Sequence, residues 1–276
     1  MSFGSGPPPT LESLTSALEH AGFPDARAEA GELMSAACGD VEVLRDLAAR
    51  RVHGEPLAWL TGSTVFLGSR VRVEPGVYVP RPQTEPLARR AIERLPESGL
   101  AVDLATGSGA LAVAMTAARP RARVVASDLD PAACRCARSN GVEVFEGDLG
   151  RPFPGRLRGS FDVVVGVVPY VPTDEIVFLP RDVRRYEPLV ALDGGGGGLE
   201  VLEEAVRWGA TLLRPGGALL LELGGHQDEG LRPVLDQTGF VVTDRLVDGD
   251  GDLRGVEAVL SVDRRVHLPD QDLGGL

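Results

Sequence analysis

Three acidic side chains, each at the end of a short apolar run, are the residues of this sequence best placed to bind a polar ligand. They are Asp103, Asp128 and Asp148, and the turn Gly107-Ser108-Gly109 comes directly after the first run. Glycines there let the backbone approach a ligand closely and adopt dihedral angles that other residues avoid. A carboxylate at the second strand end can accept both hydroxyls of a ribose. The third is placed to meet an adenine edge.

Two interpretations of these residues are open. Each aspartate alone is typical of a residue that caps a turn or a helix. Three of them at successive strand ends, beside a glycine turn, favour a nucleoside ligand. A nicotinamide cofactor is less favoured, because only GxG of the GxGxxG fingerprint is present.

Other reactive residue types form no site by their spacing. Cys134 and Cys136 lie in one predicted helix without a second pair at zinc-ligand spacing, so we expect thiols and no metal. His226 follows a predicted strand and is either a general base or a loop histidine.

An alternation of strands and helices must position the three aspartates. The predicted strands are 100–104, 124–127, 142–145, 161–165, 218–223, 241–246 and 255–262. The predicted helices between them are 109–119, 131–140, 199–213 and 227–238. This order predicts an α/β fold with a doubly wound, mostly parallel sheet, whose ligands bind at the carboxyl ends of the strands. An acidic turn at 248–252 separates the last two strands as an antiparallel hairpin.

The first part of the chain has a different pattern. We expect a flexible tail at 1–10, a small helical domain at 11–62 and a β-hairpin linker at 63–82 that turns at Glu74-Pro75-Gly76. The catalytic domain is predicted at 83–264, followed by a second flexible tail at 265–276. By itself the glycine run Gly194–Gly198 is typical of a linker.

Composition excludes several classes of protein. The 276 residues carry 28 Lys+Arg against 40 Asp+Glu, a net charge of −12, which argues against a protein that grips nucleic-acid phosphates. All the basic residues are arginines, so no lysine is available for a Schiff base or a Walker-type loop. No apolar run reaches the ~20 residues of a membrane span, and no signal peptide is visible. The 3 cysteines make no disulfide framework, so we expect a cytoplasmic protein.

Several motifs resemble one enzyme family. GEPLAWLTG (54–62), PRPQTE (80–85), DLATGSGALA (103–112), YEPLVALDGG (186–195) and LRPGGALLLELGGHQ (213–227) are similar to the HemK-type protein-(glutamine-N5) methyltransferases. The resemblance implies a seven-stranded class I methyltransferase domain behind a small helical domain, with S-adenosylmethionine as cofactor. The implied cofactor-binding residues are Asp103, Ala105, Thr106, Gly107, Gly109, Asp128, Leu129, Asp148, Leu149 and Val167. The implied substrate-binding residues are Arg81, Thr84, Val167, Val168, Pro169, Tyr170 and Glu187. Only the resemblance implies that Gly194–Gly198 forms a mobile loop over the mouth of the pocket.

The sequence departs from this family at the reacting centre. The family's Asn-Pro-Pro-Tyr corresponds here to Val167-Val168-Pro169-Tyr170, of which the last three are the implied catalytic residues. An amide nitrogen is a poor nucleophile. In the family, the asparagine oxygen and a backbone carbonyl accept the hydrogens of the amide, which orients its nitrogen toward the methyl donor. Val167 has no such acceptor, whereas the Val168 carbonyl and the aromatic face of Tyr170 remain.

The resemblance implies methyl transfer to a glutamine side-chain amide in a translation protein, either a release factor or a ribosomal protein. Two alternatives stay open: a methyltransferase for a small-molecule acceptor, and a cofactor-binding module without turnover. Neither direct DNA binding nor a membrane partner is expected. For Arg81 the sequence leaves open contact with substrate or pairing with Glu85, and for Glu187 contact with a substrate amide or a structural role.

Overall fold

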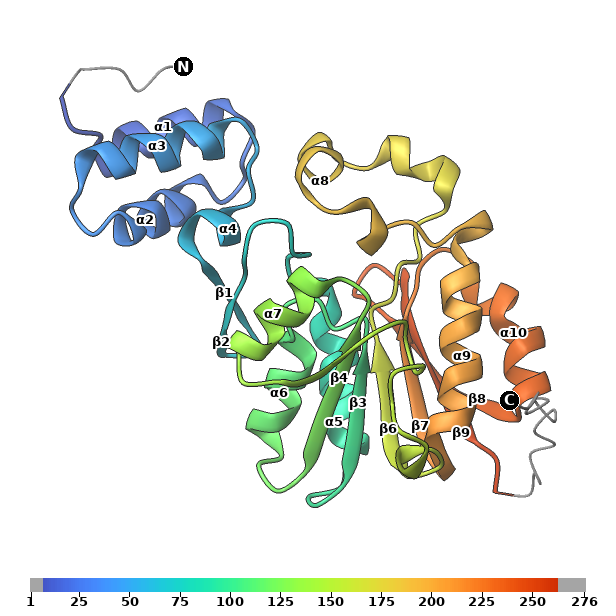
Figure 1. Cartoon of the computed structure of the whole chain (residues 1–276). Helices are drawn as coiled ribbons and strands as arrows, with labels where there is room; N and C mark the ends of the chain where they lie inside the picture. The colour runs from blue at the N-terminus through green and yellow to red at the C-terminus, as the bar shows by residue number, and fades with distance from the viewer. Residues whose placement is uncertain (1–6, 263–276) are drawn as a thin grey trace, which may run out of the picture.

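The computed structural model describes residues 7–262 as a small helical lobe beside a larger α/β lobe (Figure 1). The tail predicted at 265–276 lies outside the described residues, as do residues 1–6 of the tail predicted at the other end. Among residues 7–262, no helix is long and apolar enough to cross a membrane.

Four helices form the small lobe: α1 (Leu11–His20), α2 (Ala26–Ala36), α3 (Val41–Val52) and α4 (Leu57–Thr61). The Asp40 side chain accepts hydrogen bonds from the first turn of α3, which explains why that helix begins there. Leu14, Leu18 and Leu33 are almost completely buried between the helices. This core is separate from the cores of the larger lobe.

A two-stranded hairpin joins the lobes, and its turn is not where the sequence predicted it. Strands β1 (Ser63–Phe66) and β2 (Ser69–Arg72) pair antiparallel around Leu67-Gly68. Both turn residues have positive φ, 46° and 76°, as a two-residue hairpin turn requires. The predicted turn at Glu74-Pro75-Gly76 is wrong: those residues form a later turn, after which no second strand follows. Leucine rarely adopts positive φ, so the true turn carried no signal at its first position.

The large lobe contains one seven-stranded sheet in the order β5-β4-β3-β6-β7-β9-β8. Its strands are β3 (Leu100–Leu104), β4 (Arg123–Asp128), β5 (Glu143–Glu146), β6 (Phe161–Gly166), β7 (Leu213–Glu222), β8 (Phe240–Val247) and β9 (Leu253–Leu260). Strands β3 to β7 run parallel and β9 is antiparallel to both of its neighbours. The predicted fold class is confirmed. The strand order reverses between β3 and β6, which is where such sheets bind ligands.

Helices cover both faces of the sheet (Figure 1). They are α5 (Glu85–Arg94), α6 (Ala110–Ala118), α7 (Pro131–Ser139), α9 (Glu200–Leu212) and α10 (Gln227–Thr238). Val163 and Val165 of β6 point toward the core under α5 and α6, whereas Val164 points toward the core under α9 and α10. This alternation is the period of two expected for a strand that is buried on both sides. Helix α5 was not predicted from the sequence.

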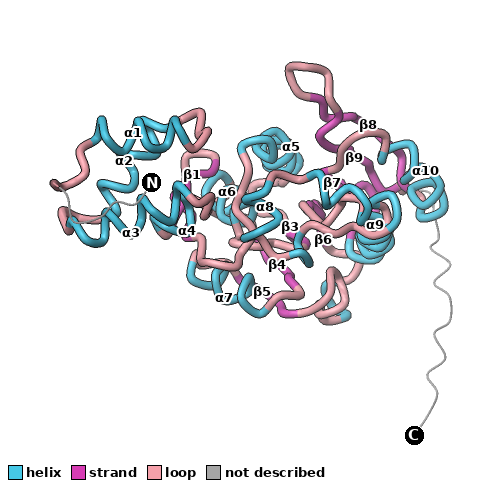
Figure 2. The backbone as a smooth tube through the Cα atoms, turned by 90° about the horizontal axis from the view of Figure 1, so that it is seen from above, coloured by secondary structure: helices cyan, strands magenta, loops and turns pink. Residues whose placement is uncertain are grey.

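An excursion between β6 and α9 lies above the carboxyl edge of the sheet (Figure 2). It contains the helix α8 (Arg181–Tyr186) and the 3-10 turns η3 (Thr173–Phe178), η4 (Leu189–Ala191) and η5 (Gly196–Gly198). Two more 3-10 turns are η1 (Pro82–Thr84) and η2 (Gly155–Leu157). Tyr186 of α8 packs edge-on against Trp59 of α4, with ring centroids 6.3 Å apart, so the excursion also contacts the small lobe.

The run Gly194–Gly198, interpreted from the sequence as a mobile loop over the pocket, packs closely against neighbouring atoms at Gly194, Gly195 and Gly198. A Cβ atom at Gly198 would lie 2.0 Å from the Tyr170 carbonyl oxygen, so the run packs tightly against that segment. The Gln227 side chain donates hydrogen bonds to the carbonyls of Gly197 and Gly198, at 3.2 and 3.4 Å. Close packing therefore explains the glycines at 194, 195 and 198, whereas a Cβ atom at Gly197 would meet no atom within 4 Å.

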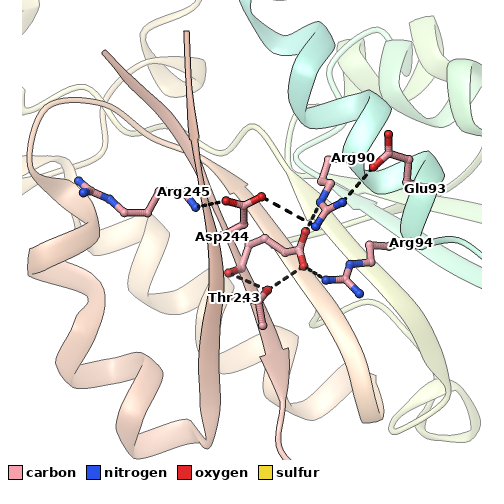
Figure 3. A network of polar contacts seen from close by, with 7 residues as sticks. Arg90, Glu93, Arg94, Thr243, Asp244 and Arg245 are labelled. Atoms are coloured by element: carbon pink, nitrogen blue, oxygen red, sulfur yellow. Dashed lines mark hydrogen bonds and ion pairs between the residues drawn. The ribbon is translucent and has the colours of Figure 1, made fainter. Parts of the chain in front are cut away.

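A buried carboxylate fastens α5 to the far half of the sheet (Figure 3). Glu257 of β9 is completely buried and accepts hydrogen bonds from Arg90, Arg94 and the Thr243 hydroxyl. Burial raises the pKa of Glu257, but the bonds from Arg94, Thr243 and Arg90 outweigh it and hold the pKa below its usual value. The ionised form therefore stabilises the fold.

Replacing this carboxylate by an amide is expected to destabilise the fold. We predict that Glu257→Gln lowers the free energy of unfolding by about 1–3 kcal/mol at pH 7, because two arginines lose their buried partner. Because the pKa is lowered on folding, this contribution is fully present well above the unfolded-state pKa of about 4.3, and it is lost as pH falls through the folded-state pKa. Urea titrations of the wild type and of Glu257→Gln, at pH 7 and below the folded-state pKa of Glu257, measure how the difference in their free energies of unfolding changes with pH.

The matched control is Glu93→Gln, since Glu93 also pairs with Arg90 at 3.0 Å but its side chain is 63% exposed. We expect the control to change stability by less than about 0.5 kcal/mol. Equal effects of the two variants would contradict the role given to Glu257.

Candidate functional site

A cleft opens at the carboxyl edge of the sheet. It is bounded by the ends of β3, β4 and β6, by the segment 76–84 after the hairpin, and by Pro188, Val190 and Ala191 of the excursion. The predicted site residues that line it are Arg81, Thr84, Asp103, Ala105, Thr106, Gly107, Asp128, Leu129, Asp148, Leu149, Val167 and Pro169. The topology thus brings most of them to one place.

Four predicted residues lie behind the wall of the cleft and do not line it. They are Gly109, Val168, Tyr170 and Glu187. A Cβ atom at Gly109 would lie 2.9 Å from the Val142 side chain, so this glycine lets α6 start close to β5. Val168 is 1% exposed and belongs to the core under α9 and α10.

Asp103, near the end of β3, holds the start of the glycine turn through a hydrogen bond with Thr106. Its carboxylate accepts a hydrogen bond of 2.5 Å from the Thr106 hydroxyl, and the residue is 1% exposed. Burial raises the pKa of Asp103 to about 7, even though the bond from Thr106 acts in the opposite direction. Ala105 and Gly107 both have positive φ, which bends the backbone sharply at the strand end.

Asp128 joins the ends of β4 and β3. One carboxylate oxygen accepts a hydrogen bond from the Gly107 amide at 2.8 Å, and the other accepts from the Asp130 amide at 2.9 Å. Burial raises the pKa of Asp128, so further donors that reach it are favourable. The ribose hydroxyls of S-adenosylmethionine are such donors. Asp148 stands at the same edge with its side chain 45% exposed. These residues fit a nucleoside cofactor.

The opposite side of the cleft, formed by Val167 and Pro169, is apolar. Tyr170 lies directly behind it and donates a hydrogen bond to Glu222 at 3.0 Å, while its carbonyl accepts from Gln227 at 2.7 Å. Burial, followed by the charge of Glu222, raises the pKa of Tyr170, so the phenol stays protonated. The segment 167–170 is thus held from two sides.

The side of the cleft that Val167 and Pro169 form is called the acceptor side below, and a second polar contact lies at it. Arg81 forms an ion pair with Glu187, whereas Glu85 pairs with Arg89, so the predicted alternative in which Arg81 pairs with Glu85 is wrong. The guanidinium also lies 5.2 Å from the centre of the Tyr78 ring. Burial raises the pKa of both Glu187 and Glu222. Each keeps one buried carboxylate oxygen without a hydrogen-bond partner among residues 7–262.

The sequence analysis missed three residues of this region: Tyr78, Glu222 and Gln227. Glu222 carried a signal, because it is a charged residue directly after three leucines of a predicted buried strand. Gln227 and Tyr78 carried none, since their contacts join segments far apart in the chain. His226 precedes α10 outside the lining of the cleft, and no metal-binding group of three or more His, Cys, Asp or Glu occurs within 7–262.

Comparison with known proteins agrees with this architecture. A ribosomal protein L11 methylase from Lactobacillus delbrueckii subsp. bulgaricus superimposes with a TM-score of 0.50 at 18% identity, over 69% of this chain and 85% of that one. This likeness concerns the fold alone. Together, the sheet order, the glycine turn after β3 and the acidic end of β4 define a class I S-adenosylmethionine-dependent methyltransferase.

Sequence comparison is more specific, although no protein-family model matches the chain. A release factor glutamine methyltransferase from Geobacter sulfurreducens is 35% identical over 246 residues, covering 81% of this chain and 86% of the relative. A 4-amino-L-phenylalanine/4-methylamino-L-phenylalanine methyltransferase from Streptomyces pristinaespiralis is 38% identical, covering 69% of this chain and 68% of that protein. The chain belongs to the release factor glutamine methyltransferase family.

Removing the Asp128 carboxylate is expected to abolish cofactor binding. We predict that Asp128→Ala weakens S-adenosylmethionine binding by about 10²-fold or more, because both the ribose acceptor and the Gly107 bond are lost. Calorimetric titration with the cofactor and with its demethylated product measures the change. Glu143→Ala is the control, since Glu143 pairs with Arg123 at 2.7 Å and does not line the cleft, and its affinity should equal that of the wild type. An unchanged affinity in Asp128→Ala would contradict this placement of the cofactor.

Proposed function

We propose that this protein transfers a methyl group from S-adenosylmethionine to the side-chain amide nitrogen of a glutamine in a peptide-chain release factor. The observation that carries this proposal is the 35% identity to a release factor glutamine methyltransferase over most of both chains. An acceptor in the translation machinery, a ribosomal protein included, also implies a cytoplasmic location.

The arrangement of the cleft supports methyl transfer between its two sides. Bound S-adenosylmethionine supplies the electrophilic methyl group. Asp103, Asp128 and Asp148 would hold the nucleoside and amino-acid parts of the cofactor, with Gly107 at the closest approach. The acceptor nitrogen would enter between Pro169 and the segment that carries Arg81. Binding both partners in one geometry supplies much of the rate enhancement of such a displacement.

The contacts of Tyr170 and Pro169 hold the segment 167–170, which forms the acceptor side of the cleft, in one position. Glu222 and Gln227 hold Tyr170 at its hydroxyl and carbonyl, so the preceding residues have little freedom. Pro169 restricts Val168 to an extended backbone, and Val168 packs into the core, so the wall that Val167 and Pro169 present to the acceptor is fixed in place.

A second candidate is methylation of an aromatic amine on a free amino acid. Two observations favour it: Val167 offers no hydrogen-bond acceptor, and the Streptomyces relative is named for such an acceptor. The lone pair of an arylamine is less delocalised than that of an amide, so the nitrogen needs less orientation.

Restoring the asparagine distinguishes the two candidates. On a release-factor peptide that contains Gly-Gly-Gln, we predict that Val167→Asn raises kcat/KM by about 10²-fold, because one preorganised acceptor is regained. On 4-amino-L-phenylalanine the same variant gives no increase. Transfer of radiolabelled methyl from S-adenosylmethionine measures both rates.

Val190→Asn is the matched control, since it adds the same amide to another residue that lines the cleft. We expect no increase of kcat/KM in Val190→Asn on either acceptor. A wild-type protein that methylates only the aromatic amine would replace the first candidate by the second. A protein that binds S-adenosylmethionine and methylates neither acceptor would be a binding module, and both candidates would fail.

A further inference from the structure

The chain contains one asparagine, Asn140, and its side chain connects three segments that are far apart in the sequence. It is the C-terminal cap of α7, and Gly141 follows with φ of 83°. The amide oxygen accepts a hydrogen bond from the Arg72 amide of β2 at 2.9 Å. The amide nitrogen donates to the Arg72 carbonyl at 2.9 Å and to the Ser108 carbonyl at 2.8 Å.

The contact with Arg72 imitates one step of a β-ladder. Strand β2 pairs only with β1 among the described strands, so its outer edge presents free backbone groups. A carboxamide has a donor and an acceptor in one plane, so a single side chain satisfies the N–H and the C=O of one residue. Aspartate lacks the donor, and alanine lacks both groups.

The contact with Ser108 reaches the cofactor side of the cleft. Ser108 is the middle residue of the glycine turn, lines the cleft and is 2% exposed. The preceding amide, that of Gly107, is held by Asp128 from the side of β4. The following amide, that of Gly109, donates to the Thr106 carbonyl at 2.8 Å. The Ser108 carbonyl is therefore fixed by Asn140, on the outer side of the turn.

The hairpin that Asn140 holds is itself attached to the small lobe. The Trp59 indole of α4 donates a buried hydrogen bond of 2.9 Å to the Val77 carbonyl, which follows the hairpin and lines the cleft. The Val73 amide donates to the Gly62 carbonyl at 3.1 Å, at the junction of α4 and β1. Cys136 of α7 adds a weak contact to the Arg72 carbonyl at 3.4 Å.

We propose that Asn140 is a positioning residue for the cofactor, which fixes the glycine turn relative to the hairpin and so couples the small lobe to S-adenosylmethionine binding. The inference rests on the assignment of this turn to the cofactor and is independent of the methyl acceptor. Without the side chain, the 108–109 peptide loses its only side-chain restraint within the described residues, and ordering it again on binding costs affinity.

Calorimetric titration of S-adenosylmethionine tests this directly. Asn140→Ala should raise Kd about tenfold, which corresponds to ~1.4 kcal/mol. Asn140→Asp should raise Kd further, because a carboxylate oxygen then faces the carbonyls of Arg72 and Ser108. Ser139→Ala is the matched control on the same helix, since its hydroxyl bonds only to Cys136 of that helix at 2.7 Å. Its Kd should equal that of the wild type.

Amide hydrogen exchange provides a second readout without any ligand. In Asn140→Ala, the Arg72 amide should exchange faster, because its acceptor is the Asn140 side chain. Added S-adenosylmethionine should slow exchange across 106–109 less in the variant than in the wild type. A role limited to stability would lower the melting temperature and leave Kd unchanged.

Kd values within twofold of the wild type for both Asn140 variants would overturn the proposal. The Asp128→Ala titration separates this outcome from a wrong cofactor site. If Asp128→Ala loses binding and the Asn140 variants do not, only the coupling fails. If neither substitution affects binding, the assignment of the turn to the cofactor fails with it.

Discussion

The hydrogen bond from the Gly107 amide to the Asp128 carboxylate is the contact on which the cofactor side of the cleft depends. It joins the ends of two parallel strands that are neighbours in the sheet but separated by a helix in the chain. Because β4 ends in a carboxylate and β3 in a glycine turn, each fixes the position of the other. Burial of Asp103 and Asp128 gives this contact a large energetic weight, since a buried carboxylate without donors is costly.

The acceptor side is built by different means. Its elements are the segment 76–84 after the hairpin and the excursion after β6. Arg81 joins the first to Glu187 of the second, and Glu222 of β7 holds Tyr170. The sheet fixes only the point at which the excursion begins. Side-chain contacts between residues far apart in the sequence then determine the position of the acceptor side. A substitution in one of these contacts can therefore change the acceptor side without changing the cofactor side.

This difference explains what the sequence could predict. Strands β3 to β9 and four of the helices follow from hydrophobic periodicity, and the aspartates at the strand ends come together because parallel strands end at one edge. The hairpin turn was misplaced because Leu67 adopts positive φ without any residue-type signal. The contacts of Gln227 and Asn140 join segments more than 25 residues apart, and no local pattern reports such pairings.

Val167 stands where the family has a catalytic asparagine, although the fold around it is that of the family. The buried carboxylates Glu187 and Glu222 do not line the cleft. Neither therefore replaces the missing side-chain oxygen at the wall that Val167 and Pro169 form. For an amide nitrogen this weakens orientation and charge stabilisation together. For an amine nitrogen the lone pair is already available, so the same apolar wall costs little. The nucleophilicity of the acceptor, more than the shape of the fold, then decides which substrate this cleft can methylate.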